Sequence, residues 1–248
     1  MVSRGVVVVL AMVLSALSVL TAPYALAGGA LAQDPSGELF GGGHLSHKSW
    51  ISWAGAVQGF APAFTGRGSL YQSGWRLRGL VAYGQYGLVT DGQPNIATPM
   101  LFEITPGVQL RSGPLISKLY LGLHGEQHRL DRPDPGSRLR ELGYGVKIIS
   151  ENWLNLPMNS NASLDLSFST LNTSYQAMLR LGSAHFVPRL TLGPEAQLVG
   201  NGEYYQLRLG SFARWKLAHG QIEASGGISR NYDQKTSPYI SLSWLKHF

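Results

Sequence analysis

The feature that most constrains the fold of this chain is an alternation of apolar and polar side chains that returns along nearly its whole length. In the segment 115–123, four leucines fall on odd positions, whereas Lys118 and Tyr120 fall on even ones. A later segment repeats the pattern, with Leu164 and Leu166 set between serines and an aspartate. Successive side chains of a β-strand point to opposite faces, so a period of two predicts strands with one apolar and one polar face.

Twelve such runs can be counted, separated by connections rich in Gly, Pro, Asn and Asp, which are common turn residues. They cover residues 37–44, 48–60, 71–88, 98–111, 115–130, 138–153, 160–171, 173–183, 187–200, 203–217, 219–230 and 237–248. If the strands run up and down in succession, an even number places both chain ends at the same side. After residue 33, no stretch approaches the roughly 18 apolar residues that indicate a transmembrane helix.

The first 32 residues have the three parts of a secretory signal peptide. A short basic segment, 1–4, precedes a mostly apolar run, 6–20, and the tripeptide Ala-Leu-Ala follows at 25–27 and again at 30–32. A retained transmembrane helix is the alternative, but the apolar run is shorter than the roughly 20 residues that a bilayer requires. We expect cleavage after Ala32, which leaves one outer-membrane β-barrel domain at 33–248.

The composition excludes several other classes of protein. Charged residues make up only 14% of the chain, against roughly 25% in a typical soluble domain, and there is no cysteine for a disulfide scaffold or a Cys-ligated metal site. The formal net charge of +6 does not predict a nucleic-acid partner, because the chain is exported and has no basic run. The positive loop 132–140 is instead expected to meet phosphorylated outer-membrane lipid.

The polar faces of the predicted strands carry charges, and this decides which face points inward. Lys118, Glu195 and Arg208 all fall on polar positions. A dry core built from such residues would leave polar groups unsatisfied, whereas a membrane barrel turns apolar residues to lipid and polar ones to its interior. We therefore predict an all-β fold, an antiparallel up-and-down transmembrane β-barrel of about 12 strands, in the bacterial outer membrane. A soluble periplasmic β-barrel binding protein is an alternative.

Aromatic residues cluster near the predicted strand ends. They are Trp50, Trp53, Trp75, Tyr83, Tyr86, Trp153, Tyr204, Tyr205, Trp215, Tyr239 and Trp244. Amphipathic rings at this depth are typical of the two aromatic girdles of a membrane barrel, although strands are enriched in aromatic residues in any protein. The last strand, with Ile240, Leu242, Trp244 and Phe248 on one parity, looks like the assembly signal of bacterial outer-membrane barrels. Lys246 departs from that pattern.

The dipeptide Asn-Gly at 201–202 predicts a two-residue hairpin turn, because both central positions of a type I′ turn need a positive φ. A turn centred there places Leu198 opposite Tyr205 and Glu195 opposite Arg208, so that apolar side chains face each other and opposite charges meet. The candidates for lining the polar interior are Glu195, Arg208, Gln197, Gln206, His124, Glu126 and His128. Their simplest role is to hold the strands in register, and contact with a solute is the alternative.

No motif for nucleotide binding or acyl transfer occurs in the chain. On a strand, His124, Glu126 and His128 would point the same way, which makes them a candidate set of metal ligands. Alternate residues of one strand are poorly spaced for a single tetrahedral centre, and a polar interior wall is the other interpretation. No spacing selects a Ser–His–acid set either. We therefore predict no catalytic, cofactor-binding or metal-binding residues.

Six stretches resemble the cellulose biosynthesis protein BcsS family. They are AGAV at 54–57, SGWRLR at 73–78, YGQY at 83–86, GPEAQ at 193–197, GN at 200–201 and YQLRLG at 205–210. The resemblance extends over roughly residues 37–248 and implies an exported protein associated with bacterial cellulose synthesis. It brings no established catalytic residues, so none are transferred.

These observations together predict a non-enzymatic outer-membrane β-barrel associated with cellulose biosynthesis or export. The expected partners are outer-membrane lipid and either cellulose or components of its secretion machinery. Two alternatives share the fold: an outer-membrane enzyme acting on lipid or polysaccharide, and a general small porin. A Ser, a His and an acid gathered at one rim of the barrel would favour the enzyme.

Overall fold

The structure is a computed structural model that describes residues 34–61, 66–90, 92–133, 142–202, 205–231 and 235–248. The predicted signal peptide, residues 1–32, and most of the predicted basic loop, 132–140, lie outside these ranges. Within them, no helix has the length and apolar character needed to cross a bilayer.

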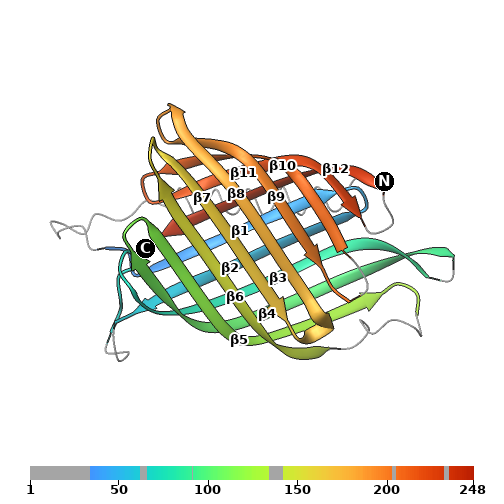
Figure 1. Ribbon diagram of the computed structural model, residues 1–248. Helices are drawn as coiled ribbons and strands as arrows, with labels where there is room; N and C mark the ends of the chain where they lie inside the picture. Colours follow the sequence, from blue (N-terminus) through green and yellow to red (C-terminus); the bar gives the residue numbers. More distant parts are fainter. Residues whose placement is uncertain (1–33, 62–65, 91, 134–141, 203–204, 232–234) are drawn as a thin grey trace, which may run out of the picture.

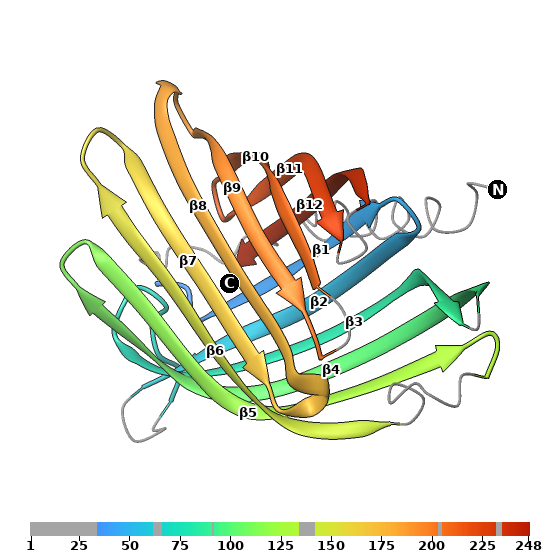
Figure 2. The same ribbon diagram turned by 45° about the vertical axis from the view of Figure 1, so that its right-hand side comes forward.

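The described residues form a closed barrel of twelve antiparallel strands, each paired with its neighbours in the chain (Figures 1 and 2). The strands are β1 (Gly37–Ser46), β2 (Ser49–Phe60), β3 (Gly74–Thr90), β4 (Gln93–Ser112), β5 (Leu115–Leu130), β6 (Gly143–Leu156), β7 (Ser160–Ser169), β8 (Ser174–Val187), β9 (Leu190–Gly200), β10 (Tyr205–Leu217), β11 (Gly220–Asn231) and β12 (Thr236–His247). A short 3₁₀ helix, η3 (Leu171–Thr173), joins β7 to β8. The predicted all-β, up-and-down barrel is confirmed.

The first and last strands close the barrel by pairing along their length, from Glu38 with His247 to Ser46 with Tyr239. The start of β1 and the end of β12 therefore lie at the same end of the barrel, as predicted for the ends of the strand array. We call this end the terminal rim and the opposite end the far rim. Closure leaves no free sheet edge, so backbone groups at membrane depth are paired within the wall.

The predicted strand boundaries agree with the structure to within a few residues, and β5 agrees fully. The largest difference among the described residues lies at the far rim, where β4 begins at Gln93 instead of residue 98. The predicted strand 138–153 corresponds to β6, and its first four residues, 138–141, lie outside the described residues. β4 begins early because Gln93 already pairs with Thr90 across a two-residue connection. Pro94 and Asn95 suggested a loop, but a proline is tolerated at a strand end.

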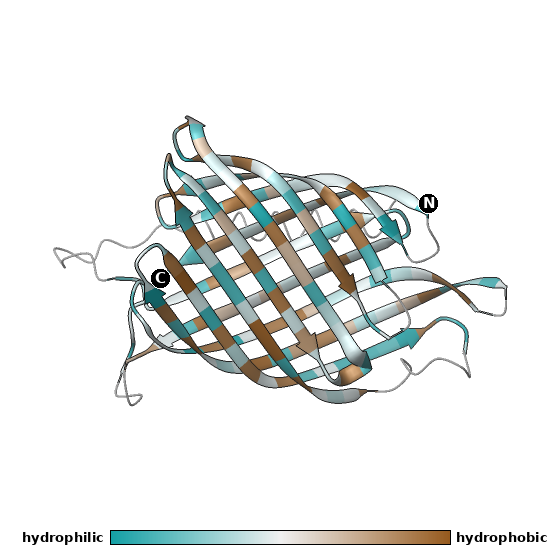
Figure 3. Cartoon of the chain, in the orientation of Figure 1, coloured by the Kyte–Doolittle hydropathy of each residue, from teal (hydrophilic) through white to brown (hydrophobic). Residues whose placement is uncertain are grey.

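Apolar side chains cover the outside of the barrel and polar ones fill the inside. On β5, Leu119 is 50% exposed and Leu121 is 57% exposed, whereas Tyr120 between them is fully buried. Glu195 on β9 is only 4% exposed, and bands of apolar and polar residues alternate along the wall (Figure 3). The predicted inverted arrangement is confirmed, and the soluble alternative is wrong because it requires these leucines inside.

The predicted register of the β9–β10 hairpin is wrong by two residues. Leu198 pairs with Leu207 instead of Tyr205, and Arg208 pairs with Gln197 instead of Glu195. The connection covers residues 201–204, four residues instead of two. A shift of two keeps every side chain on its face, so the apolar pattern does not distinguish the two registers.

The predicted aromatic girdles are correct for the outward-facing rings only. Near the far rim, the outer wall carries Trp50, Tyr83 and Tyr205, and near the terminal rim it carries Trp75, Trp215 and Trp244. Trp53, Tyr86, Trp153 and Tyr239 belong to the inner face, and Tyr204 lies outside the described residues. The prediction considered only how near each aromatic residue lies to a strand end. Whether its ring points outward or inward depends instead on whether its position is odd or even along the strand.

Candidate functional site

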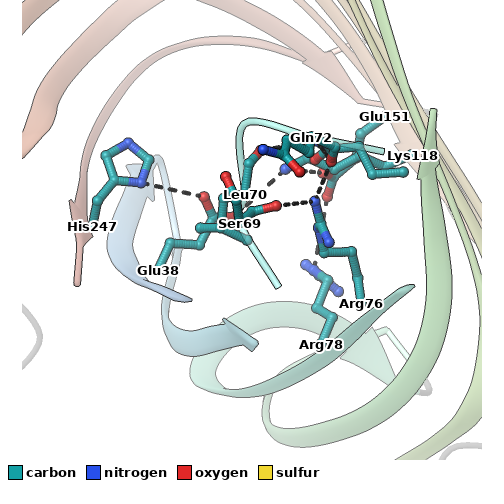
Figure 4. Close-up of polar contacts among 10 residues, drawn as sticks. Glu38, Ser69, Leu70, Gln72, Arg76, Arg78, Lys118, Glu151 and His247 are labelled. Atoms are coloured by element: carbon teal, nitrogen blue, oxygen red, sulfur yellow. Dashed lines mark hydrogen bonds and ion pairs between the residues drawn. The ribbon is translucent and has the colours of Figure 1, made fainter. Parts of the chain in front are cut away.

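The barrel interior holds a first group of ion pairs, contributed by β1 and β3 to β6, which we call the first network. Its members are Glu38, Arg78, Glu103, Lys118, Lys147 and Glu151. The ammonium nitrogen of Lys118 lies 3.5 Å from a carboxylate oxygen of Glu38 and 3.5 Å from one of Glu151 (Figure 4). With three cations and three carboxylates, the first network carries no net charge.

Glu103 stands at the other end of the first network and is almost completely buried. It forms ion pairs with Arg78 and with Lys147, whose Nζ lies 2.6 Å from Oε2 of Glu103. Arg78 also approaches Glu151, with 3.8 Å between Nε and Oε1. Because β3 and β6 are not neighbours in the barrel, the Arg78–Glu151 contact crosses the interior.

A second group of ion pairs comes from β8 to β12, and we call it the second network. Its members are Arg180, Glu195, Arg214, Glu223 and Tyr239. Arg180 lies 2.5 Å from Glu195 and 2.9 Å from Glu223, and Arg214 lies 2.6 Å from Glu223. The Tyr239 hydroxyl donates to Glu195 at 3.2 Å. Two guanidinium groups meet two carboxylates, so the second network is also neutral.

Aromatic rings support the guanidinium groups of the second network. The Arg214 guanidinium lies 4.8 Å from the ring centre of Trp153 and 5.2 Å from that of Phe212, and Arg180 lies 5.6 Å from the same Phe212 ring. A ring face attracts a cation and holds the planar group in place. The contact of Arg214 with Trp153 joins β10 to β6 across the interior.

Four of the predicted interior residues lie on β9 and β10. Arg208 donates to Gln206 at 2.6 Å and to Gln197 at 2.9 Å, and Gln206 donates to Asn231 at 2.7 Å. Glu195 belongs to the second network and pairs with Arg180, not with Arg208 as the predicted register required. The sequence placed these residues on one face, but the two-residue error in register gave Glu195 the wrong partner.

The other three predicted residues, His124, Glu126 and His128, lie buried on β5 toward the far rim. His128 hydrogen-bonds through Nε2 to Glu126 and lies 3.0 Å from the Tyr86 hydroxyl through Nδ1. Glu126 also accepts a hydrogen bond of 3.2 Å from Asn172 of η3. His124 faces the Ser169 hydroxyl at 2.9 Å. Each of the three therefore has a protein partner, and we call this group the far-rim cluster.

The far-rim cluster does not have the geometry of a metal site or a hydrolase relay. Among the described residues, no three His, Asp or Glu side chains are placed to hold a metal ion. Ser169 and His124 do meet, but Ser169 is fully buried and the carboxylate of Glu126 bonds a different histidine. A relay needs one histidine between the nucleophile and the acid.

Sequence reasoning missed a segment that folds across the terminal rim. Residues 66–73 of the β2–β3 connection, which we call the strap, are held by two buried side chains, Arg76 and Gln109. Figure 4 shows Arg76 beside Ser69 and Gln72 of the strap. Arg76 donates to the carbonyls of Ser69 and Gln72, at 3.0 and 2.7 Å.

Gln109 donates to the carbonyls of Leu70 and Gln72, at 2.8 and 3.0 Å. The predicted strand 71–88 included the last three strap residues, but β3 begins only at Gly74 because these residues turn into the mouth of the barrel. The one sequence feature that could have indicated the strap is that Arg76 and Gln109 fall on inward-facing positions of their strands.

The model of the family described as cellulose biosynthesis protein BcsS matches residues 38–248, which is nearly the whole described barrel. No curated protein matches the chain.

Among solved structures, the chain is similar to the COG4313 outer membrane channel from Pseudomonas putida F1, with a TM-score of 0.56 and 11% identity over 91% of this chain and 100% of that one. The KdgM porin matches with a TM-score of 0.47 and 8% identity, over 85% of this chain and 99% of that chain. The translocator domain of the autotransporter NalP from Neisseria meningitidis matches with a TM-score of 0.47 and 10% identity, over 96% of this chain and 95% of that one.

The apolar outer wall, together with the fold shared with the COG4313 channel, places the protein in the bacterial outer membrane, as predicted.

Proposed function

The chain belongs to the cellulose biosynthesis protein BcsS family, and from this premise we propose that it serves cellulose production at the outer membrane without catalysing a reaction. The observation that carries the proposal is the family match over 38–248 on a barrel whose outer wall is apolar. Its partners are the cellulose chain or the components that secrete it. These partners contact the polar side chains and loops that the barrel presents to water at its two rims.

The non-enzymatic role is supported by the far-rim cluster, where a Ser, a His and an acid gather without forming a relay. Ser169 also accepts a hydrogen bond of 3.2 Å from the backbone amide of Leu171, so its hydroxyl is used to hold η3 against β7. His124 likewise bonds Ser169 of β7, and Glu126 bonds Asn172 of η3. These hydrogen bonds give Ser169, His124 and Glu126 a structural role.

Deletion of the protein from its own bacterium tests the proposal. We expect less extracellular cellulose, or cellulose that no longer attaches to the cell, and restoration of both by the full-length chain. Unchanged quantity and attachment would remove the role in cellulose production while leaving the fold untouched.

The Ser169→Ala variant separates the barrel from an outer-membrane enzyme. We expect this variant to restore cellulose as well as the unmodified chain does, because no step uses the hydroxyl as a nucleophile. Loss of the phenotype from a folded Ser169→Ala barrel would favour the enzyme instead. Detection of the variant in the outer-membrane fraction provides the control for folding.

A further inference from the structure

We infer that the interior of this barrel is closed to a glucan chain, so that the protein acts on cellulose from its rims and not by conduction. The closure has two parts, the strap at the terminal rim and the two networks behind it. This inference goes beyond the proposed function, because a cellulose-associated barrel could equally be an open channel.

Contacts between strands that are far apart in the wall carry the argument. Lys118 of β5 meets Glu38 of β1, and Arg214 of β10 meets Trp153 of β6. Each contact joins strands four positions apart in a ring of twelve described strands, which is one third of the circumference. Neighbouring strands are about 4.8 Å apart, so these side chains meet only by reaching across the interior.

Three more contacts join strands three positions apart. They are Arg78 with Glu151, Arg180 with Glu223, and Tyr239 with Glu195. The crossing contacts come from every strand except β2, β4 and β7, so they divide the interior from several directions. A pyranose ring cannot pass between partners that are in contact.

Within each network the number of cations equals the number of carboxylates. This equality favours a closed interior over a selectivity filter. A filter for anions or cations presents an excess of one charge to the solute. Here the carboxylates of Glu103 and Glu223 are each shared by two cations, and each network as a whole is neutral. Opening a path requires these bonded partners to separate from one another.

The strap adds a second barrier at the terminal rim. Leu70 of the strap is buried, and its amide donates to the Pro35 carbonyl at 2.8 Å, which ties the strap to the segment before β1. Arg76 and Gln109 hold it from the inside with four hydrogen bonds. Glu38 of the first network lies beside Ser69 and Leu70 of the strap (Figure 4), so the strap and the first network adjoin each other.

Ion conductance of the purified protein in planar lipid bilayers tests the closure. We expect the unmodified barrel to give no stable channel steps above the bare bilayer. A first variant, Arg76→Ala/Gln109→Ala, releases the strap. A second variant combines Glu38→Ala/Lys118→Ala with Glu223→Ala/Arg214→Ala. It removes crossing contacts, and because each pair is one cation and one carboxylate, the net charge does not change. We expect each set to give brief openings, and all six substitutions together to give stable steps.

Liposome swelling in cellotetraose gives a second readout with the relevant class of solute. We expect swelling only with the six-substitution variant, and no change with Arg129→Ala, which alters an exposed residue on the outer wall. Stable channel steps or swelling with the unmodified barrel would overturn the inference, even if the variants failed to fold. A folded six-substitution variant that stayed closed would overturn the assignment of these residues as the seal.

These outcomes are independent of the deletion experiment. A conducting unmodified barrel leaves the role in cellulose production intact, whereas a deletion without a cellulose phenotype leaves the closure intact.

Discussion

The two networks inside the barrel are built differently, although each joins strands that are not neighbours in the wall. Two of the three cations of the first network are lysines. The ammonium nitrogen of Lys118 lies 3.5 Å from carboxylate oxygens of Glu38 and Glu151. The side chain of Lys118 is 22% exposed and that of Glu151 is 29% exposed. The second uses only arginines as cations, at 2.5 to 2.9 Å, and Arg214 and Glu223 are at most 7% exposed. The Lys118 end of the first network is therefore more exposed and looser than the second network, whereas its Glu103 end is as buried and as closely paired.

The difference follows from the side chains available. An ammonium group is a compact, strongly hydrated charge, whereas a guanidinium group is planar, loses less hydration and stacks on rings. Phe212 and Trp153 give the second network such rings, while in the first only Arg78 has one, with Phe40 at 5.3 Å. The comparison indicates that the second network fixes the shape of the barrel more strongly than the Lys118 end of the first.

The largest expected effect is the loss of Glu223 from the second network. Glu223→Ala leaves Arg180 and Arg214 buried with Glu195 as the one remaining carboxylate of that network, so we expect the free energy of unfolding to fall by about 3–5 kcal/mol. Denaturant unfolding in lipid bilayers measures the change. Glu223→Gln keeps an acceptor in place and should lose less. Equal losses for the two variants would contradict the importance of the acceptor.

The corresponding change in the first network should cost less. Lys118→Ala removes the contacts to Glu38 and Glu151, but water already reaches these groups, so we expect a loss of only about 1–2 kcal/mol. The same unfolding experiment applies, with Lys118→Arg as the control that retains the charge. A loss as large as that of Glu223→Ala would show that the two networks are equivalent.

The contribution of the rings is expected to be smaller than that of a missing charge. Arg214→Lys keeps a cation beside Glu223 but loses the planar contacts with Trp153 and Phe212, which we expect to cost about 1 kcal/mol. Lys147→Arg in the first network makes the opposite exchange and should not weaken the barrel. If Arg214→Lys is neutral, the rings do not explain the difference between the networks.

A change in salt concentration should alter the stability of these variants least. It tests whether the Lys118 contacts are more hydrated than those of Glu223. Raising the ionic strength from about 0.1 to 1 M shortens the screening length from about 10 to 3 Å, which weakens hydrated ion pairs more than buried ones. We expect the cost of Lys118→Ala to shrink by less than about 1 kcal/mol and that of Glu223→Ala to stay constant. Unfolding curves of both variants at the two salt concentrations measure this, and equal salt dependence would contradict it.

Some features of this structure could be predicted from the sequence and others could not. The outward position of Leu121 and the inward position of His124 followed from parity, since neighbouring positions of a strand face opposite sides. The partner of Glu195 did not follow, because a register shift of two residues leaves parity unchanged. The strap was missed because turn residues mark where a strand ends and not where the connecting chain then folds.

The amino-acid sequence by itself determined the number of strands and the inverted, apolar-outside wall, because a period of two is a local property that every strand carries in its own residues. Only the tertiary structure decided that Lys118 meets Glu38, that Arg214 meets Trp153, and that the strap lies on Arg76. These contacts join residues far apart in the chain. They depend on register and on the curvature that closes the sheet, and no single segment encodes either.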